Sequence, residues 1–185
     1  MEILESPLQG VFLLKPKIFR DERGYFYESY HQKKFSELGL DINFVQDNHS
    51  FSKQGTLRGL HYQLSSPQGK LVQVLQGEVF DVMVDIRKGS PTFGQWHGIY
   101  LSNENHIQVY IPPNFAHGFY VLSETAFFSY KCTEHYRPGD EYSIVWNDLD
   151  INIKWPIDQT PLLSRKDAEA PTLEQSMDNL PDFNA

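Results

Sequence analysis

Phe80-Asp81-Val82-Met83-Val84-Asp85-Ile86 alternates in polarity with a period of two residues. The even-numbered positions are all apolar, whereas the odd-numbered positions include Asp81 and Asp85. A period of two is typical of a β-strand, because successive side chains point to opposite faces of the sheet. The stretch therefore predicts a half-buried strand whose apolar parity faces the core.

The same alternation recurs in Ile107–Ile111 and Ala126–Thr133. In the second run Phe128, Tyr130 and Cys132 share one face, so Tyr130 is predicted to point inward. Turn-forming residues separate the strands at 76–78, 88–91, 102–105, 112–114 and 137–140. Many short strands at close spacing predict an all-β antiparallel sandwich or barrel.

Helix is predicted in only two places. Tyr30–Leu38 is expected to form a short helix that ends at Gly39, a residue suited to the position after a helix. Ser164–Met177 is expected to mix turn and helix, with Pro171 interrupting it. The chain has no internal repeat and no linker-like shift in composition, so residues 1–185 are expected to form one domain.

Composition narrows the class of protein. The chain has 185 residues and a net charge of −8, which disfavours nucleic acid or an anionic membrane as the main partner. Cys132 is the only cysteine, so an internal disulfide and a cysteine zinc site are both excluded. The first residues lack a basic and apolar leader, and no apolar run has membrane-spanning length. A cytoplasmic protein is therefore expected.

Polar residues concentrate in four segments where a plain strand core would not place them. These segments are 19–28, 45–50 followed by 55–63, 112–119 and 163–167. Each is weak evidence alone, because a histidine in a strand is more often a hydrogen-bonded structural residue than a catalyst. Asp167 could simply cap the following helical turn. The residues by themselves support only a barrel that holds His61, His117 and Tyr130 in a cavity.

A metal site is the first alternative to weigh. Metal-binding barrels of the cupin type use a His-x-His pair, a carboxylate and a later histidine. Here the pair is His61-Tyr62-Gln63, and only the later His117 is retained. Glutamine is a poor ligand for iron, manganese or nickel, which prefer imidazole and carboxylate. The sequence therefore predicts no bound metal.

Four motifs together resemble one enzyme family. They are Arg58-Gly59-Leu60-His61-Tyr62-Gln63, Pro112–Phe119, Tyr130–Thr133 and Leu163-Ser164-x-Lys166-Asp167, in this order. This set resembles the dTDP-4-dehydrorhamnose 3,5-epimerase family, from about Gly10 to about Asp167. The resemblance implies a cupin-like jelly-roll barrel with a few short peripheral helices. It also implies a homodimer that works without a metal or another cofactor.

The resemblance implies a substrate and a reaction. The substrate would be a dTDP-4-keto-6-deoxyhexose, epimerised at C3 and C5 on the way to dTDP-L-rhamnose. Both hydrogens flank the C4 ketone, so removing either gives an enolate that needs a base, an acid and a group near the oxygen. By resemblance His61 is the base, oriented by Asp167, and Tyr130 is the acid on the opposite ring face. Lys70, after a Ser65–Gly69 turn that is expected to be flexible, resembles the family's lysine near the keto oxygen.

The resemblance also implies a set of binding residues. Arg23, Arg58 and Lys166 match positions that contact the nucleotide sugar or its diphosphate, although the adjacent Arg165 leaves open which cation of that pair reaches the ligand. Tyr136 resembles the aromatic residue that stacks on thymine. The remaining matches are polar or aromatic contacts to the base and sugar: Phe19, Phe26, Glu28, Gln46, Asp47, Asn48, His117 and Glu141.

Three other interpretations stay open at this point. A related enzyme on the same fold could epimerise one carbon only, or move the ketone between C3 and C4. A non-catalytic sugar-binding cupin would not need His61, Asp167 and Tyr130 together. A metal-dependent oxygenase or isomerase would need ligands that Gln63 does not supply.

Overall fold

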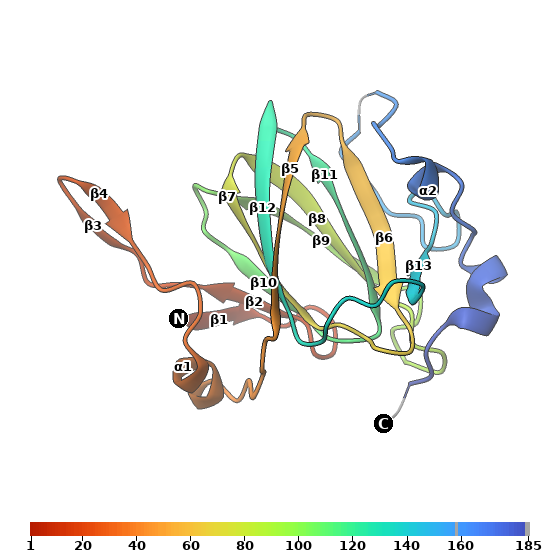
Figure 1. The fold of residues 1–185 in the computed structure, drawn as a ribbon, viewed down its shortest axis with the longest axis horizontal. Coiled ribbons are helices and arrows are strands. Elements are labelled where there is room, and N and C mark those ends of the chain that lie inside the picture. Colours follow the sequence, from red (N-terminus) through yellow and green to blue (C-terminus); the bar gives the residue numbers. More distant parts are fainter. Residues whose placement is uncertain (158, 184–185) are drawn as a thin grey trace.

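The structure, a computed structural model, describes residues 1–157 and 159–183. Its body is two antiparallel sheets that face each other, as Figure 1 shows. One sheet has the strand order β1-β2-β10-β7-β12-β5, and the other has the order β13-β6-β11-β8-β9. The strands of the body are β1 (Glu2–Glu5), β2 (Phe12–Lys15), β5 (Gln46–Lys53), β6 (Leu57–Gln63), β7 (Lys70–Gln76), β8 (Glu78–Asp85), β9 (Trp96–Ser102), β10 (Gln108–Ile111), β11 (Phe115–Val121), β12 (Thr125–Cys132) and β13 (Glu141–Ser143). This arrangement confirms the predicted all-β, cupin-like barrel.

The main core lies between the two sheets. It is built from alternate side chains of both, among them Val72 and Phe128 from one sheet and Met83 and Phe119 from the other. The predicted strand runs are confirmed as β8, β10 and β12. Phe128 and Cys132 are buried and Tyr130 packs on this core, so the predicted inward parity of β12 is confirmed.

The prediction of a half-buried strand at 80–86 is wrong, because both faces of β8 are buried. Its apolar parity, including Val82 and Val84, does not face the space between the sheets. Those residues pack with Ile151 and Leu180 of the C-terminal segment, which covers the outer face of the five-stranded sheet. Asp81 lies on the parity that faces the interior, where it is completely buried. The aspartates therefore mark the inside of the barrel.

The helices are short and peripheral. The first is α1 (Gln32–Glu37), with Gly39 at φ +80°, and its Phe35 packs with Leu14, Leu71 and Tyr110 of the six-stranded sheet. The second is α2 (Arg165–Ala168), and a 3₁₀ helix follows at Glu174–Asn179. Both predicted helical regions are confirmed. No helix of the described residues is long and apolar enough to cross a membrane.

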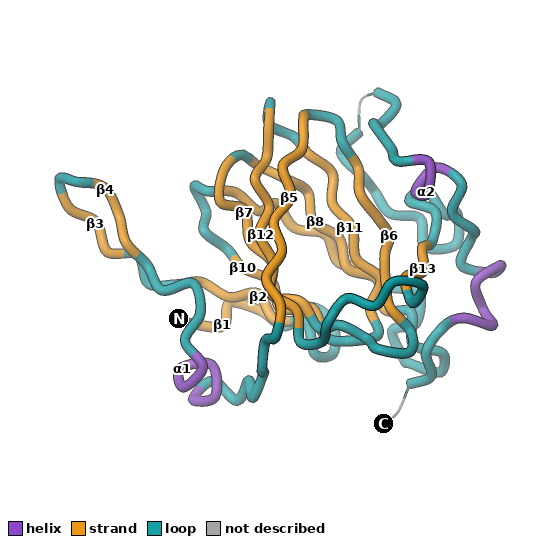
Figure 2. Tube along the Cα trace, in the orientation of Figure 1, coloured by secondary structure: helices purple, strands orange, loops and turns teal. Residues whose placement is uncertain are grey.

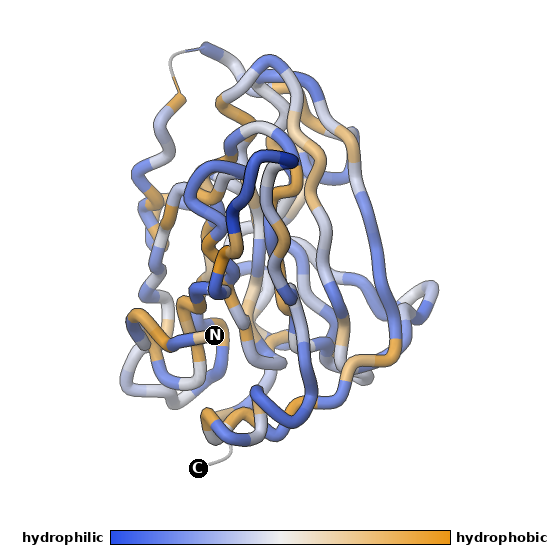
Figure 3. The backbone as a smooth tube through the Cα atoms, turned by 90° about the vertical axis from the view of Figure 1, so that its left-hand side faces the viewer, coloured by the Kyte–Doolittle hydropathy of each residue, from blue (hydrophilic) through white to orange (hydrophobic). Residues whose placement is uncertain are grey.

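A hairpin projects from the body. It consists of β3 (Phe19–Asp21) and β4 (Gly24–Phe26), and Figures 1 and 2 show it extending away from both sheets. All its residues are exposed. Its tip is strongly hydrophilic and faces the viewer in Figure 3. A two-stranded ribbon of this kind has little core of its own, and the Tyr25 ring of β4 packs against the His106 ring of the body at 4.9 Å between centroids.

Candidate active site

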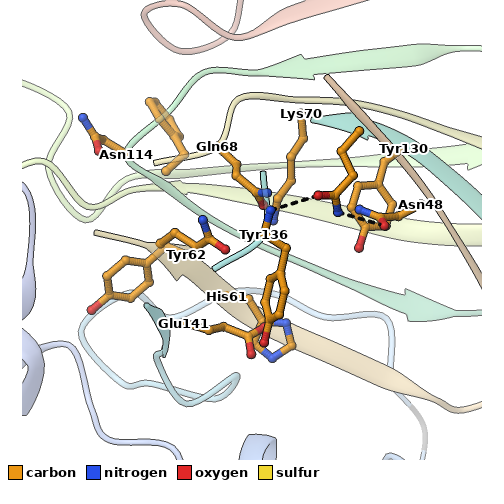
Figure 4. Close-up of a pocket in the computed structure, with 12 residues that line it drawn as sticks. Asn48, His61, Tyr62, Gln68, Lys70, Asn114, Tyr130, Tyr136 and Glu141 are labelled. Carbon is orange, nitrogen blue, oxygen red and sulfur yellow. Dashed lines mark hydrogen bonds between the residues drawn. The ribbon is translucent and has the colours of Figure 1, made fainter. Parts of the chain in front are cut away.

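A polar cavity of about 230 Å³ opens between the two sheets. Both sheets and the loops at their ends contribute to it, as Figure 4 shows. The lining residues are Gln46, Asn48, His61, Tyr62, Gln63, Gln68, Lys70, Asn114, Phe115, Tyr130, Tyr136 and Glu141. Several polar groups that converge in one cleft are the usual signature of a ligand site.

His61 and Asp167 form a hydrogen-bonded pair at one wall of the cavity. The Nε2 of His61 lies 2.5 Å from the Oδ1 of Asp167, and the aspartate side chain is only 4% exposed. A carboxylate can only accept, so Nε2 carries the proton and Nδ1 of the neutral ring keeps its lone pair. The pair therefore presents an unprotonated imidazole nitrogen that can take a proton.

Asp167 is held as a carboxylate. Burial alone would raise the pKa of Asp167, but hydrogen bonds from His61, Ser164 and the Gly59 backbone outweigh it and lower the pKa. The Ser164 hydroxyl donates to Oδ2 at 2.8 Å and accepts from the Asp167 backbone N–H at 3.1 Å. Ser164, rather than Asp167, is thus the N-cap of α2. The sequence alternative that Asp167 is merely a cap is wrong.

Two glycines bring the site strands together. His61 on β6 lies opposite His117 on β11. A β-carbon on Gly59 would lie 2.5 Å from the Gly118 Cα, and one on Gly118 would lie 2.7 Å from the Arg58 carbonyl oxygen. Only glycine allows this approach, and Gly59 also has φ +130°. The close approach sets where His61 enters the cavity.

Tyr130 and Lys70 stand on the opposite sheet from His61. Tyr130 lies on β12 and Lys70 on β7, which are neighbouring strands of the six-stranded sheet. Burial, assisted by Cys132 and Glu141, raises the pKa of Tyr130, so its phenol keeps its proton at neutral pH. Burial lowers the pKa of Lys70, although electrostatic interactions with Cys132, Glu141 and Asp81 act to raise it. The Tyr130 phenol and the His61 imidazole thus face the cavity from different sheets.

Polar side chains continue toward the mouth. The Gln46 amide donates to Asn48 at 3.1 Å, and the Tyr136 backbone N–H donates to Gln46 at 2.9 Å. Glu141 pairs with Lys166 at 2.5 Å. Arg165, by contrast, is 88% exposed and pairs with Glu169. Lys166 is therefore the cation of the adjacent pair that reaches the cavity rim.

His117 has a buried partner that the sequence did not identify. Its Nε2 lies 2.8 Å from Oδ2 of Asp81, and both side chains are buried. His117 does not line the cavity, but it lies beside His61 across the β6–β11 ladder. Oδ1 of Asp81 has no hydrogen-bond partner in the described part of the chain. The only sequence signal was the pair of aspartates within an apolar strand.

Several predicted residues lie away from the cavity. Phe19, Arg23 and Phe26 are on the exposed hairpin, with Arg23 paired to Asp21 at 2.5 Å. Glu28 follows the hairpin and pairs with Lys34. The chain by itself does not bring these four residues to His61.

Two further predicted residues lie near the cavity but do not line it. Asp47 points outward on β5 and pairs with Lys131 at 2.9 Å. Arg58 is exposed, hydrogen-bonds Ser52 at 3.1 Å, and is close enough to act electrostatically on Tyr130. Neither lines the cavity as it is formed in one chain.

The lining residues that were not predicted are Tyr62, Gln63, Gln68, Asn114 and Phe115. Tyr62 and Gln63 belong to the motif at 58–63, Asn114 and Phe115 belong to the motif at 112–119, and Gln68 lies in the 65–69 turn, and these positions were the only available signal. Across residues 1–157 and 159–183, no group of three or more His, Cys, Asp or Glu side chains is arranged to hold a metal ion.

Comparisons with known proteins agree with one another. The family model described as dTDP-4-dehydrorhamnose 3,5-epimerase matches residues 5–175. The dTDP-4-dehydrorhamnose 3,5-epimerase of Salmonella typhimurium is 56% identical over 179 residues, which covers 96% of this chain and 98% of that protein.

Two solved structures are also similar. One is a dTDP-6-deoxy-D-glucose-3,5-epimerase from Legionella pneumophila in complex with dTDP-4-keto-L-rhamnose, with 53% identity and a TM-score of 0.96 over 100% of this chain and 99% of the other. The second is a 3′-monoepimerase from Streptomyces bikiniensis in complex with dTDP-quinovose. It has 36% identity and a TM-score of 0.89 over 94% of this chain and 89% of the other.

Proposed function

This chain belongs to the dTDP-4-dehydrorhamnose 3,5-epimerase family, and we propose that it epimerises dTDP-4-dehydro-6-deoxy-D-glucose at C3 and C5 to give dTDP-4-dehydro-L-rhamnose. It is an isomerase that acts on a nucleotide-activated sugar. The reaction belongs to dTDP-L-rhamnose biosynthesis, and the enzyme works in the cytoplasm.

The observation that carries the proposal is the opposition of His61 and Tyr130 across one cavity. Inverting a carbon next to a ketone needs a proton taken from one ring face and another delivered to the other face. His61 takes the α-proton at Nδ1, because Nε2 is engaged by Asp167. Asp167 stabilises the imidazolium that forms. Tyr130 then gives its phenolic proton to the opposite face of the enolate.

Lys70 acts on the C4 oxygen. In the ammonium form its Nζ offers three donors and a positive charge within a partly buried wall of the cavity. Enolate formation places negative charge on that oxygen, so the interaction is stronger in the transition state than in the ground state. Lys70 thereby lowers the barrier to proton removal.

The nucleotide binds toward the mouth. Tyr136 stacks on thymine, while Gln46, Asn48 and Glu141 contact the base and sugar. Arg58 and Lys166 bind the diphosphate, because guanidinium and ammonium groups suit phosphate oxygens. His117 does not line the cavity and supports the His61 wall from the neighbouring strand, and Asp47 contributes through the backbone of β5.

The enzyme is a homodimer in which each hairpin completes the site of the other subunit. Phe19, Arg23, Phe26 and Glu28 belong to the binding set but project away from the cavity of their own chain. Phe19 and Phe26 are 50% and 66% exposed, although large aromatic side chains usually find cover. A second copy supplies that cover and places Arg23 near the diphosphate.

A second candidate reaction is epimerisation at C3 alone. It is favoured by the likeness to the 3′-monoepimerase, whose fold matches nearly the whole chain. Both reactions use the same base and the same enolate chemistry, so the residues that line the cavity are compatible with either reaction. They differ in whether C5 is also inverted.

Proton NMR of the reaction in deuterated water tests both candidates. Incubation with dTDP-4-dehydro-6-deoxy-D-glucose is expected to give deuterium at C3 and C5 and a product with both centres inverted. Deuterium and inversion confined to C3 would support the monoepimerase instead. Absence of exchange at both carbons, with dTDP still bound, would contradict an epimerase of either kind.

A further inference from the structure

Two loops at the mouth of the cavity are joined into one unit. Residues 64–69 connect β6 to β7, and residues 133–140 connect β12 to β13. The Asp140 carboxylate accepts the backbone N–H groups of Ser65 and Ser66 at 2.9 and 2.8 Å. At the other end, Gly69 and Thr133 exchange hydrogen bonds of 2.8 and 2.9 Å. The turn that the sequence predicted to be flexible is therefore tied along its length to its neighbour.

Gln63 joins the same two loops from inside the cavity. The residue is 6% exposed. The amide Nε2 donates to the Ser66 carbonyl at 2.7 Å, and Oε1 accepts the Arg137 backbone N–H at 3.3 Å. One loop thus offers an acceptor and the other a donor. A carboxamide meets both needs with one side chain, whereas a carboxylate or an alkyl group does not.

Tyr136 depends on the backbone that Gln63 holds. The residue is 49% exposed and its side chain lines the cavity together with His61, as Figure 4 shows. Its own N–H is fixed by Gln46, and the next N–H, that of Arg137, is fixed by Gln63. Two consecutive peptide groups are therefore anchored to the cavity wall. This fixes the direction in which the Tyr136 side chain leaves the loop.

We infer that Gln63 is a positioning residue that orients Tyr136 for stacking on the nucleobase of the substrate. The inference rests on the proposed function, which assigns the stacking role to Tyr136. Gln63 acts through the loop backbone and does not touch the reacting carbons. Nucleobase recognition depends on it, whereas proton transfer does not.

Binding of dTDP and of inorganic pyrophosphate to Gln63→Met separates these effects. Methionine keeps the volume and removes both hydrogen bonds. We expect the Kd for dTDP to rise about tenfold, because stacking on an aromatic ring is worth about 1–3 kcal/mol per base and a misaligned ring loses part of it. The Kd for pyrophosphate, which has no base, is expected to stay within about twofold. In turnover, KM rises while kcat changes little, as for loss of uniform binding.

A double-mutant cycle with Tyr136→Ala decides whether Gln63 acts through Tyr136. If it does, the double variant binds dTDP no more weakly than Tyr136→Ala alone. Gln54→Leu is the matched control, because Gln54 also ties a turn through a carbonyl, that of Leu122 at 2.8 Å, on the exposed surface. It is expected to leave both affinities unchanged. Asp140→Asn, which weakens the same loop junction from outside the cavity, is expected to act in the same direction as Gln63→Met.

Three results would overturn the inference. Losses that add in the double variant would mean that Gln63 acts independently of Tyr136. Equal weakening of dTDP and pyrophosphate, or no weakening of either, would reduce Gln63 to a general structural residue. If Gln63→Met does not fold, the same double-mutant cycle is measured with Asp140→Asn in place of Gln63→Met.

If Tyr136→Ala itself leaves dTDP affinity unchanged while Gln63→Met weakens it, the stacking role in the proposed function fails as well. A chain that binds dTDP as expected but exchanges no protons would contradict the proposed reaction alone.

Discussion

Asp167 and Tyr130 illustrate how burial sets the state of a single residue. Both are removed from water, which by itself disfavours their charged forms. Asp167 receives hydrogen bonds from His61, Ser164 and a backbone amide, and its pKa is lowered. For Tyr130 the interactions that favour the charged form, with Arg58 and Asn48, are weaker than the effect of burial, and its pKa is raised. At neutral pH one is a charged acceptor and the other a protonated donor, as the proposed roles require.

Asp167→Asn is expected to cut turnover by about two orders of magnitude or more, because the imidazolium loses its charged partner. The fold and dTDP affinity are expected to remain, since Asn can still accept from Nε2 and Asp167 lies below the cavity wall. Steady-state kinetics and dTDP titration measure these two quantities. Turnover near that of the wild type would remove Asp167 from the catalytic machinery.

The lowered pKa of Asp167 also predicts a pH dependence of stability. A carboxyl with a lowered folded-state pKa contributes stability above its unfolded value, here 3.8, and loses it as pH falls through the lower folded value. The difference in unfolding free energy between wild type and Asp167→Asn should therefore be largest near neutral pH and shrink below about pH 4. Urea unfolding between pH 3 and 7 measures it. A difference that is constant with pH would contradict the argument.

Tyr130→Phe separates the two proton transfers. The variant keeps the ring that packs on Phe128 and deletes the phenolic proton. Enolate formation at His61 continues, and a solvent-exchanged proton can return to the face from which it came. In deuterated water, inversion should therefore fall more than exchange at C3 and C5. Equal losses in both, with substrate still bound, would argue against Tyr130 as the acid.

At the scale of elements, the site depends on how closely β6 and β11 approach. The two strands place His61 beside His117, and Gly59 and Gly118 meet at the closest point. β6 also carries Leu60 and Tyr62 into the cluster beneath the C-terminal segment. The same short strand therefore anchors the outer layer and presents His61 to the cavity. A displacement of β6 would move His61 relative to Asp167.

Gly118→Ala tests this strand approach. Its β-carbon would lie 2.7 Å from the Arg58 carbonyl oxygen, so the strands must separate at a cost of about 1–3 kcal/mol. We expect lower stability together with a fall in kcat of about tenfold or more, since sub-ångström placement of a base matters.

Gly98→Ala on β9 is the control for Gly118→Ala. Its β-carbon would meet the Phe80 ring at 2.2 Å, so it overpacks the same sheet away from the cavity. It should lower the melting temperature comparably while kcat per folded molecule is retained. Equal kinetic losses in the two variants would contradict the argument.

At the scale of the whole molecule, an acidic protein must bind an anionic ligand. The net charge is −8, yet Lys70 lines the cavity and Lys166 lies at its rim, with Arg58 close by. Arg23 lies on the hairpin, 90% exposed and distant from these cations in the same chain. In a dimer that inserts the hairpin into the partner's site, the cations gather around one diphosphate. The assembly, rather than the chain, then completes the anion site.

Mixing two inactive variants tests the shared site. Arg23→Ala and His61→Ala homodimers should each turn over slowly. After subunit exchange, a mixed dimer has one site with both Arg23 and His61 and one site with neither. At equal amounts, about a quarter of wild-type activity should return, because half the dimers are mixed and half their sites are intact. If activity stays at the mean of the two homodimers although mass spectrometry detects mixed dimers, the hairpin does not cross between subunits.

The sequence by itself determined the fold class and predicted most of the residues that line the cavity. Period-two alternation at 80–86, 107–111 and 126–133 predicted strands because side-chain direction in a strand depends only on local geometry. The motifs around His61, Tyr130 and Lys166 predicted residues that the structure gathers at one cavity and its rim.

Only the tertiary structure decided which face of each strand meets which neighbour. Alternation shows that β8 has two faces, but it does not show that the C-terminal segment covers the apolar one and leaves Asp81 inside the barrel. Hydrogen bonds also join residues that are far apart along the chain: His117 and Asp81 are 36 residues apart, Gln63 and Arg137 are 74 apart, and His61 and Asp167 are 106 apart. Hydrogen bonds of this kind depend on strand register and loop packing, and these arise only when both sheets close around one core.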